Sequence, residues 1–135
     1  WRLETELVEE MESWLPQIEQ HRYEWQSLIL MTRTLDLKKR AAFVIEEVDY
    51  FHANCRPVEP EWERRIAEQK AILKEIRSLR TEIRGHFGRR YHGEHFREWL
   101  RELFGVEEAR IRTLGPECRR KRAEARRIYS RRRRP

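Results

Sequence analysis

The fold is decided by residues 60–87, which read PEWERRIAEQKAILKEIRSLRTEIRGHF. From Trp62 onward, mainly apolar side chains recur in alternating steps of four and three positions. The series is Trp62, Ile66, Gln69, Leu73, Ile76, Arg80, Ile83 and Phe87. Because an α-helix turns once in about 3.6 residues, these steps place the side chains on one face, as in a coiled coil. The stretch predicts one long amphipathic helix over about residues 60–87.

Shorter helical patterns come before this stretch. Leu3, Leu7 and Met11 recur at four-residue steps and predict a first helix that ends before Pro16. A second helix can begin at Pro16, since proline is tolerated in a first turn. The stripe expected to be buried in it is Ile18, Trp25, Leu28, Ile29 and Thr32.

A third helix can be capped by Thr34 or Asp36, because these side chains accept hydrogen bonds from a first turn. Its expected apolar positions are Ala41, Ala42, Ile45, Val48 and Phe51. We expect it to stop near Cys55, since two prolines follow closely. The second and third patterns are equally compatible with one continuous helix, and the sequence leaves both arrangements open.

Glycines at 85, 88 and 93 interrupt the chain after the long helix. Residues 96–104 then follow a fully helical apolar template, with Gly105 where a C-terminal cap is expected. A weaker helical stretch over 106–114 is expected to close at Gly115-Pro116. No run alternates with the period of a strand. The sequence predicts an all-α fold, a helical bundle or extended helical hairpins, with a helical domain over 1–115 and a basic tail or helix over 116–135.

The composition limits the possible classes of protein. The chain has 135 residues, enough for one domain, and 40% of them are charged. Five Gly and five Pro are too few for a sandwich or barrel. The longest apolar run, 41–45, is too short to span a membrane, so no membrane span is expected. The chain begins with Trp1 rather than Met, which we expect of a processed product, an excised domain or the ordered part of a longer chain.

Charge is distributed unevenly along the chain. The formal net charge is +6, and the basic residues are mainly Arg. Residues 1–20 hold one Arg and six Glu, whereas residues 121–135 hold eight Lys or Arg and one Glu. Such a density of cations becomes favourable beside a polyanion, whose condensed counterions are released. The candidate nucleic-acid-binding residues here are Arg119, Arg120, Lys121, Arg122, Arg126, Arg127, Tyr129, Arg131, Arg132, Arg133 and Arg134. A solvated tail, or one paired with the acidic N-terminal segment, is the alternative.

A second basic segment lies in the glycine-rich turn over 84–93. Glycine lets a phosphate approach the backbone, while Arg and Tyr supply charge and stacking. The candidate binding residues are Arg84, Arg89, Arg90 and Tyr91. The alternative is an ordinary turn between helices whose arginines are only solvated.

The remaining motifs are weaker. The pairs His52/Cys55 and His92/His95 have a spacing that zinc ligands use, but they match no standard zinc finger. Whether Cys55 pairs with Cys118 is left open, and two cysteines are too few for a disulfide framework. We find no nucleophile with a base, no phosphate-binding loop and no dinucleotide motif. We therefore expect a non-enzymatic protein without a cofactor.

In its Arg-rich helical composition and its basic C-terminal segment, the chain resembles accessory subunits of large organellar assemblies, especially mitochondrial ribosomes. This resemblance implies a mitochondrial structural subunit that contacts rRNA or other structured RNA and neighbouring protein subunits. It transfers no individual site residue. Two alternatives stay open: a structural subunit of a protein-only assembly, such as a respiratory complex, an ATP synthase or a cytoskeletal lattice, and a helical nucleic-acid-binding subunit of bacterial or viral origin.

Overall fold

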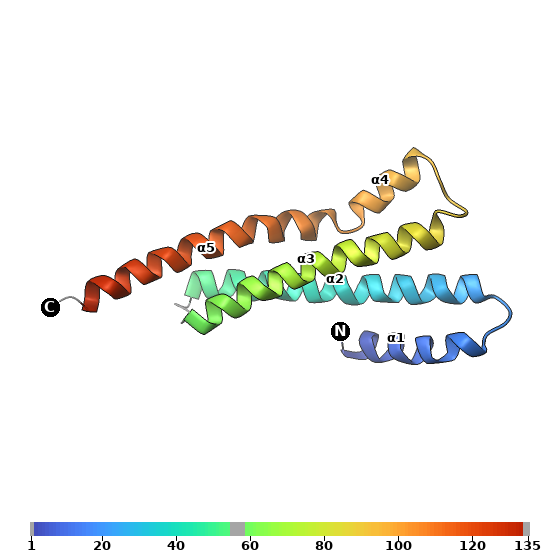
Figure 1. Ribbon diagram of the computed structural model, residues 1–135, viewed down its shortest axis with the longest axis horizontal. Coiled ribbons are helices and arrows are strands. Elements are labelled where there is room, and N and C mark those ends of the chain that lie inside the picture. Colours follow the sequence, from blue (N-terminus) through green and yellow to red (C-terminus); the bar gives the residue numbers. More distant parts are fainter. Residues whose placement is uncertain (1, 55–58, 134–135) are drawn as a thin grey trace.

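The computed structural model describes residues 2–54 and 59–133, and within these ranges the chain is helical without a strand. The all-α prediction is confirmed. The elements are α1 (Arg2–Trp14), the short 3₁₀ helix η1 (Leu15–Gln17), α2 (Arg22–Asn54), α3 (Glu59–Phe87), α4 (Glu94–Glu102) and α5 (Gly105–Arg133). Helices α2, α3 and α5 lie side by side as a bundle, with α1 added along the first half of α2 (Figure 1).

Ion pairs between the long helices show how they are aligned. Glu82 and Glu75 of α3 pair with Arg33 and Arg40 of α2, so the two helices are antiparallel. Helix α5 is antiparallel to α3 in turn, since Glu108 pairs with Arg80 near one end and Arg122 pairs with Glu63 near the other. The core therefore lies along the shared axis of three long helices.

The buried face of α3 differs in part from the expected one. Trp62, Gln69, Ile76 and Ile83 are buried as expected, but the rows between them are Arg65, Ile72 and Leu79. The predicted Ile66, Leu73 and Arg80 are only partly buried. The reason is that α3 contacts both α2 and α5, so it buries a face wider than a two-helix seam.

Helix α2 is continuous through Thr34 and Asp36. One of the two arrangements left open by the sequence placed a boundary between two helices there. Thr34 does not cap a helix, because its hydroxyl donates to the carbonyl of Leu30, one turn earlier. Asp36 accepts from Thr5 of α1 at 2.9 Å and pairs with Arg40 at 3.1 Å. These two side chains serve contacts within α2 and with α1, so the single-helix alternative is confirmed.

The face of α1 that packs on α2 includes the expected Met11 but otherwise differs from the expected one. Val8 and Met11 are buried with Ile29, whereas Leu3 and Leu7 are exposed. The indole of Trp25 donates to the carbonyl of Met11 at 3.0 Å and fixes the two helices together. Helix α2 begins at Arg22 rather than Pro16, because the chain first turns through η1 and the positive φ of His21.

Helix α5 continues through Gly115-Pro116, so the helix end expected there is wrong. Proline cannot donate to the carbonyl one turn earlier, and glycine lowers helix propensity. Packing compensates, because Leu114 and Cys118 on either side are fully buried in the main core. The expected boundary between a domain and a tail thus falls inside one helix, whose last turns extend beyond the ends of α2 and α3 (Figure 1). Across the described ranges, no helix has the length and apolarity that crossing a membrane requires.

Candidate nucleic-acid interface

Two groups of arginines can be distinguished, apart from Arg2, Arg64 and Arg112, which pair with a carboxylate on their own helix. One group joins helices: Arg33, Arg40, Arg65, Arg80, Arg110 and Arg122 each pair with a carboxylate on another helix. The other group has no carboxylate partner in the described part of the chain and lies on the surface. Its members on α5 and around α4 form the two surfaces described next.

The first surface is the α5 arginine face, made of Arg119, Arg120, Arg127 and Arg131. All four side chains are exposed, and their spacing places them on one side of the helix. From Arg119 to Arg131 the helix rises about 18 Å. Among residues 2–54 and 59–133 none of the four pairs with a carboxylate, and Glu124 is the one acid between them in sequence. This face concentrates uncompensated positive charge.

Other candidates on α5 have different positions. Arg122 is partly buried and pairs with Glu63 at 3.2 Å, so it attaches α5 to α3. Lys121 is partly buried and Arg126 is exposed. The side chains of Tyr129, Arg132 and Arg133, and the whole of Arg134, lie outside the described residues.

The second surface is the arginine groove, a hollow of about 620 Å³ between the end of α3 and α4. It is lined by Arg84, Tyr91, His92, Arg97 and Arg101 together with glycines of the turn. Arg84, Arg97 and Arg101 are exposed and have no carboxylate partner within the described ranges. Three guanidinium groups around one hollow form a site suited to phosphate oxygens.

The sequence pattern predicts Arg84 and Tyr91 as binding residues but not Arg97 and Arg101. These two are four residues apart and share one face of α4, which is a signal present in the sequence. Charged side chains on solvated helix faces have the same four-residue spacing throughout this chain, so the spacing alone does not identify a binding site. Only the position of α4 beside the end of α3 makes the pair part of a groove.

Two glycines give the turn its shape. Gly93 has a φ of 126°, a backbone conformation that residues with a side chain rarely adopt. A Cβ atom at Gly88 would clash with the carbonyl oxygen of Arg84. The amide of Tyr91 donates to the carbonyl of Phe87 at 2.8 Å and closes the turn. The glycines thus allow the chain to reverse tightly between α3 and α4.

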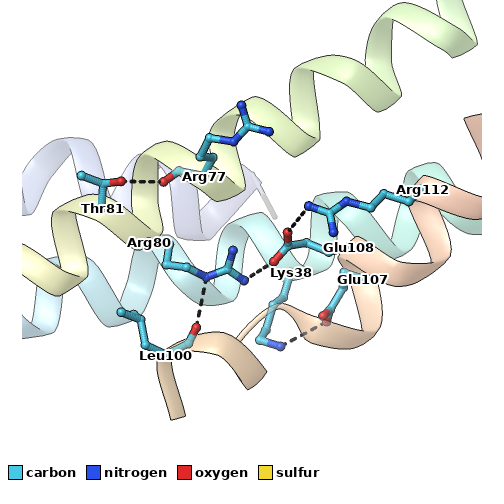
Figure 2. Close-up of polar contacts among 8 residues, drawn as sticks. All are labelled: Lys38, Arg77, Arg80, Thr81, Leu100, Glu107, Glu108 and Arg112. Carbon is cyan, nitrogen blue, oxygen red and sulfur yellow. Dashed lines mark hydrogen bonds and ion pairs between the residues drawn. The ribbon is translucent and has the colours of Figure 1, made fainter. Parts of the chain in front are cut away.

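A polar network holds α4 and the start of α5 in place (Figure 2). Arg80 donates from Nε to the carbonyl of Leu100 at 3.1 Å and also pairs with Glu108. Lys38 of α2 donates to Glu107 at 3.1 Å. Both cations lie near the ring of the fully buried Phe104, at 5.4 Å for Lys38 and 5.9 Å for Arg80. Arg80 lines the groove but is already paired, so its role is to position α4.

Arg90 and Arg89 point to different surroundings. The guanidinium of Arg90 lies 3.6 Å from the ring centroid of Tyr23, which stacks on His86 at 4.3 Å. Nε2 of His86 lies 2.8 Å from the hydroxyl of Ser27, and burial lowers the pKa of His86. Both arginines are exposed, but the guanidinium of Arg90 rests on a ring of α2.

The two zinc-spaced pairs are not brought together. Residue 52 lies in the last turn of α2, while residues 92–95 follow the far end of the antiparallel α3, about 40 Å away along that helix. Cys55 and the side chain of His52 lie outside the described residues. Within those ranges no group of three or more His, Cys, Asp or Glu is placed to hold a metal ion. Cys118 is a buried thiol that accepts a hydrogen bond from Nε2 of Gln69 at 3.3 Å, and burial raises its pKa.

The acidic N-terminal segment does not neutralise the α5 arginine face. The described ion pairs of α1 join it to itself or to α2, through Arg2–Glu6 and Lys39–Glu4. Helix α1 packs along α2, whereas α5 packs along α3 and α2 (Figure 1). The molecule therefore keeps separate acidic and basic regions.

Comparison of the chain with protein-family models, with curated proteins and with solved structures gave no match.

Proposed function

We propose that this protein is a non-enzymatic structural subunit of a ribonucleoprotein that binds RNA phosphates. One observation carries the proposal: the arginines between helices are paired with carboxylates, whereas those of the α5 arginine face and of the arginine groove are not. Unpaired arginines repel one another, and a polyanion relieves this repulsion while releasing its counterions. The identification with a mitochondrial ribosome stays a prediction from the resemblance.

The shape of the basic face supports contact with the RNA backbone rather than with base edges. The four arginines of the α5 arginine face lie along the last part of α5, and the end of this helix projects beyond α2 and α3 (Figure 1). A helix of this kind can follow a series of phosphates, since their positions do not depend on sequence. Recognition by shape and backbone is the usual mode for structured RNA.

A second candidate, a structural subunit of a protein-only assembly, is favoured by exposed apolar side chains on α2 and α5. Leu28, Leu35 and Val106 all lie largely exposed on the surface. Groups of this kind are common where a subunit contacts protein neighbours. In this candidate the unpaired arginines would face carboxylates of a partner.

The proposal is tested first with purified protein and a structured RNA. The α5 variant carries Arg119→Gln, Arg120→Gln, Arg127→Gln and Arg131→Gln. The control variant loses the same charge at four exposed cations away from both surfaces, through Arg2→Gln, Arg22→Gln, Lys70→Gln and Lys74→Gln. If four phosphate contacts are lost, we expect the α5 variant to bind about 10²–10³-fold more weakly at 0.15 M salt. Equal affinities of the two variants would contradict the assignment of the α5 arginine face.

The two candidate functions are then separated in the native source. A ribonucleoprotein subunit sediments with a large particle and is released by nuclease digestion. A chain that stays bound to the same proteins after complete digestion of RNA would support the protein-only assembly and overturn the ribonucleoprotein proposal.

A further inference from the structure

An apolar groove of about 700 Å³ adjoins the arginine groove. Leu28 and Met31 of α2 form one side, and Phe87, Tyr91, Phe96 and Trp99 form the other. Tyr91 and Trp99 are 57% and 39% exposed, which is unusual for aromatic side chains so close to a core. The volume falls in the range of about 300–1,000 Å³ that small-molecule sites occupy.

The aromatic side of this groove is preorganised. Phe87 meets Trp99 edge-to-face at 6.3 Å, and Phe96 stacks on Trp99 at 5.8 Å with an interplanar angle of 25°. Tyr91 is tilted against Phe87 at 6.4 Å. Neighbouring rings thus hold Trp99 and Tyr91 in place while both stay accessible, so little side-chain entropy remains to be lost on binding.

The apolar groove and the arginine groove share a wall. Tyr91 and Phe96 line both hollows, and the arginines Arg84, Arg97 and Arg101 lie only on the second side. A planar apolar surface therefore stands directly beside three unpaired cations. A nucleotide has the complementary pair of groups, an aromatic base and an anionic phosphate.

We propose that the apolar groove binds an unpaired base of single-stranded RNA, while the phosphate next to it lies on Arg84, Arg97 and Arg101. The proposal rests on the proposed RNA-binding function and adds a preference for single-stranded segments at this end of the bundle. Stacking between bases and aromatic side chains is how such segments are commonly held. A neighbouring protein helix is the other occupant to be tested; it would need carboxylates at matching positions, whereas every nucleotide of RNA carries a phosphate next to its base.

The test compares an oligouridylate about twelve nucleotides long with an RNA duplex of similar charge. Tyr91→Leu removes a stacking surface from the groove. Tyr50→Leu is the matched control, because Tyr50 is 60% exposed on α2 and lines neither groove. Trp99→Leu is a second probe, with circular dichroism confirming that each variant keeps its helices. Oligouridylate carrying 5-iodouridine provides a crosslinking probe of stacked aromatic residues.

We expect Tyr91→Leu to weaken oligouridylate binding about tenfold and to leave duplex binding unchanged, since stacking depends on an unpaired base. Photocrosslinking is expected at Tyr91 or Trp99. The α5 variant is expected to weaken both RNAs, which separates the two claims.

Equal oligouridylate affinity of Tyr91→Leu and Tyr50→Leu, together with an effect of the α5 variant, would overturn the base site and leave the RNA-binding function standing. If the wild-type chain binds neither RNA, the proposed function fails and the base site fails with it. A dimer in sedimentation velocity that Tyr91→Leu dissociates would show that the groove binds a protein helix, and would overturn the proposal in that way.

Discussion

Gln69 offers a sharp test of the packing, because it is a polar residue at the centre of the buried face of α3. Its side chain is 3% exposed, between Trp62 and Ile76 of the same row. Nε2 donates to Sγ of Cys118 on α5 at 3.3 Å, while Oε1 has no hydrogen-bond partner within the described residues. We expect Gln69→Met to stabilise the protein.

The magnitude follows from two opposing terms. A buried acceptor without a partner costs about 1–3 kcal/mol, and removing it recovers that amount. The lost hydrogen bond to sulfur costs about 0.5–1.5 kcal/mol, and methionine is close enough in shape that no large cavity forms. The net expectation is a gain of about 1 kcal/mol. With an unfolding entropy of about 2.1 cal/mol/K per residue, this raises Tm by about 3–4 °C.

Urea denaturation and thermal unfolding followed by circular dichroism measure this change. Gln20→Met, at an exposed position, is the matched control and is expected to change the free energy of unfolding by less than about 0.5 kcal/mol. A loss of stability on Gln69→Met would refute the reasoning. It would mean that the amide carbonyl solvates the buried charge of Arg65 one turn away, which is worth more than an apolar contact.

Three further outcomes are expected. Phe104→Ala removes a fully buried ring between Lys38 and Arg80 and should lower the free energy of unfolding by about 3–5 kcal/mol in urea, whereas an effect below 1 kcal/mol would show that the α4–α5 turn does not depend on it. Burial lowers the pKa of His86 from 6.5, so as pH falls the unfolded chain takes up this proton before the folded chain does, and the free energy of unfolding should fall below about pH 6.5. Denaturation at several pH values should show a smaller loss in His86→Gln. A pH profile that the substitution leaves unchanged would contradict this. Burial and the raised pKa of Cys118 predict that in a Cys55→Ser background this thiol reacts with a disulfide reagent only when urea unfolds the chain, and rapid labelling of the native protein would contradict the packing of α5.

The sequence carries the helical class and much of the element order. Steps of three and four residues identify helices wherever one face is buried, and they do so clearly around Trp62 and Ile83. They do not say how many neighbours a helix has. Because α3 packs against both α2 and α5, the side chain of Arg65 is buried, and it pairs with Glu47 at 2.5 Å. The spacing of residues in the sequence alone does not reveal this burial or this pair.

Local signals failed where tertiary contacts outweigh them. Gly115-Pro116 reads as a helix end, yet α5 continues because Leu114 and Cys118 are buried on both sides of it. In α1 the regular steps of Leu3 and Leu7 suggested the buried face, but Trp25 fixes the helix by its Met11 carbonyl and turns Val8 inward. Propensity and periodicity describe one element, whereas these outcomes depend on its neighbour.

The candidate site shows the same limit. The basic segments near Arg84 and Arg119 are visible in the sequence, and both have exposed arginines in the structure. Arg122 is paired with a carboxylate and Arg119 is not, because Glu63 on α3, 59 residues before Arg122 in the sequence, lies beside Arg122. The apolar groove beside the arginines was not predicted, because its two sides come from α2 and from the segment around α4.

The most direct test of the central claim is the salt dependence of RNA affinity, measured for the wild-type chain, the α5 variant and the control variant. Each phosphate contact contributes about 0.7–0.9 to the slope of log K against log salt. If the four arginines of the α5 arginine face bind phosphates, the slope of the α5 variant should be smaller than that of wild type by about 2.8–3.6, while the control variant keeps the wild-type slope. Identical slopes for wild type and the α5 variant would contradict the account.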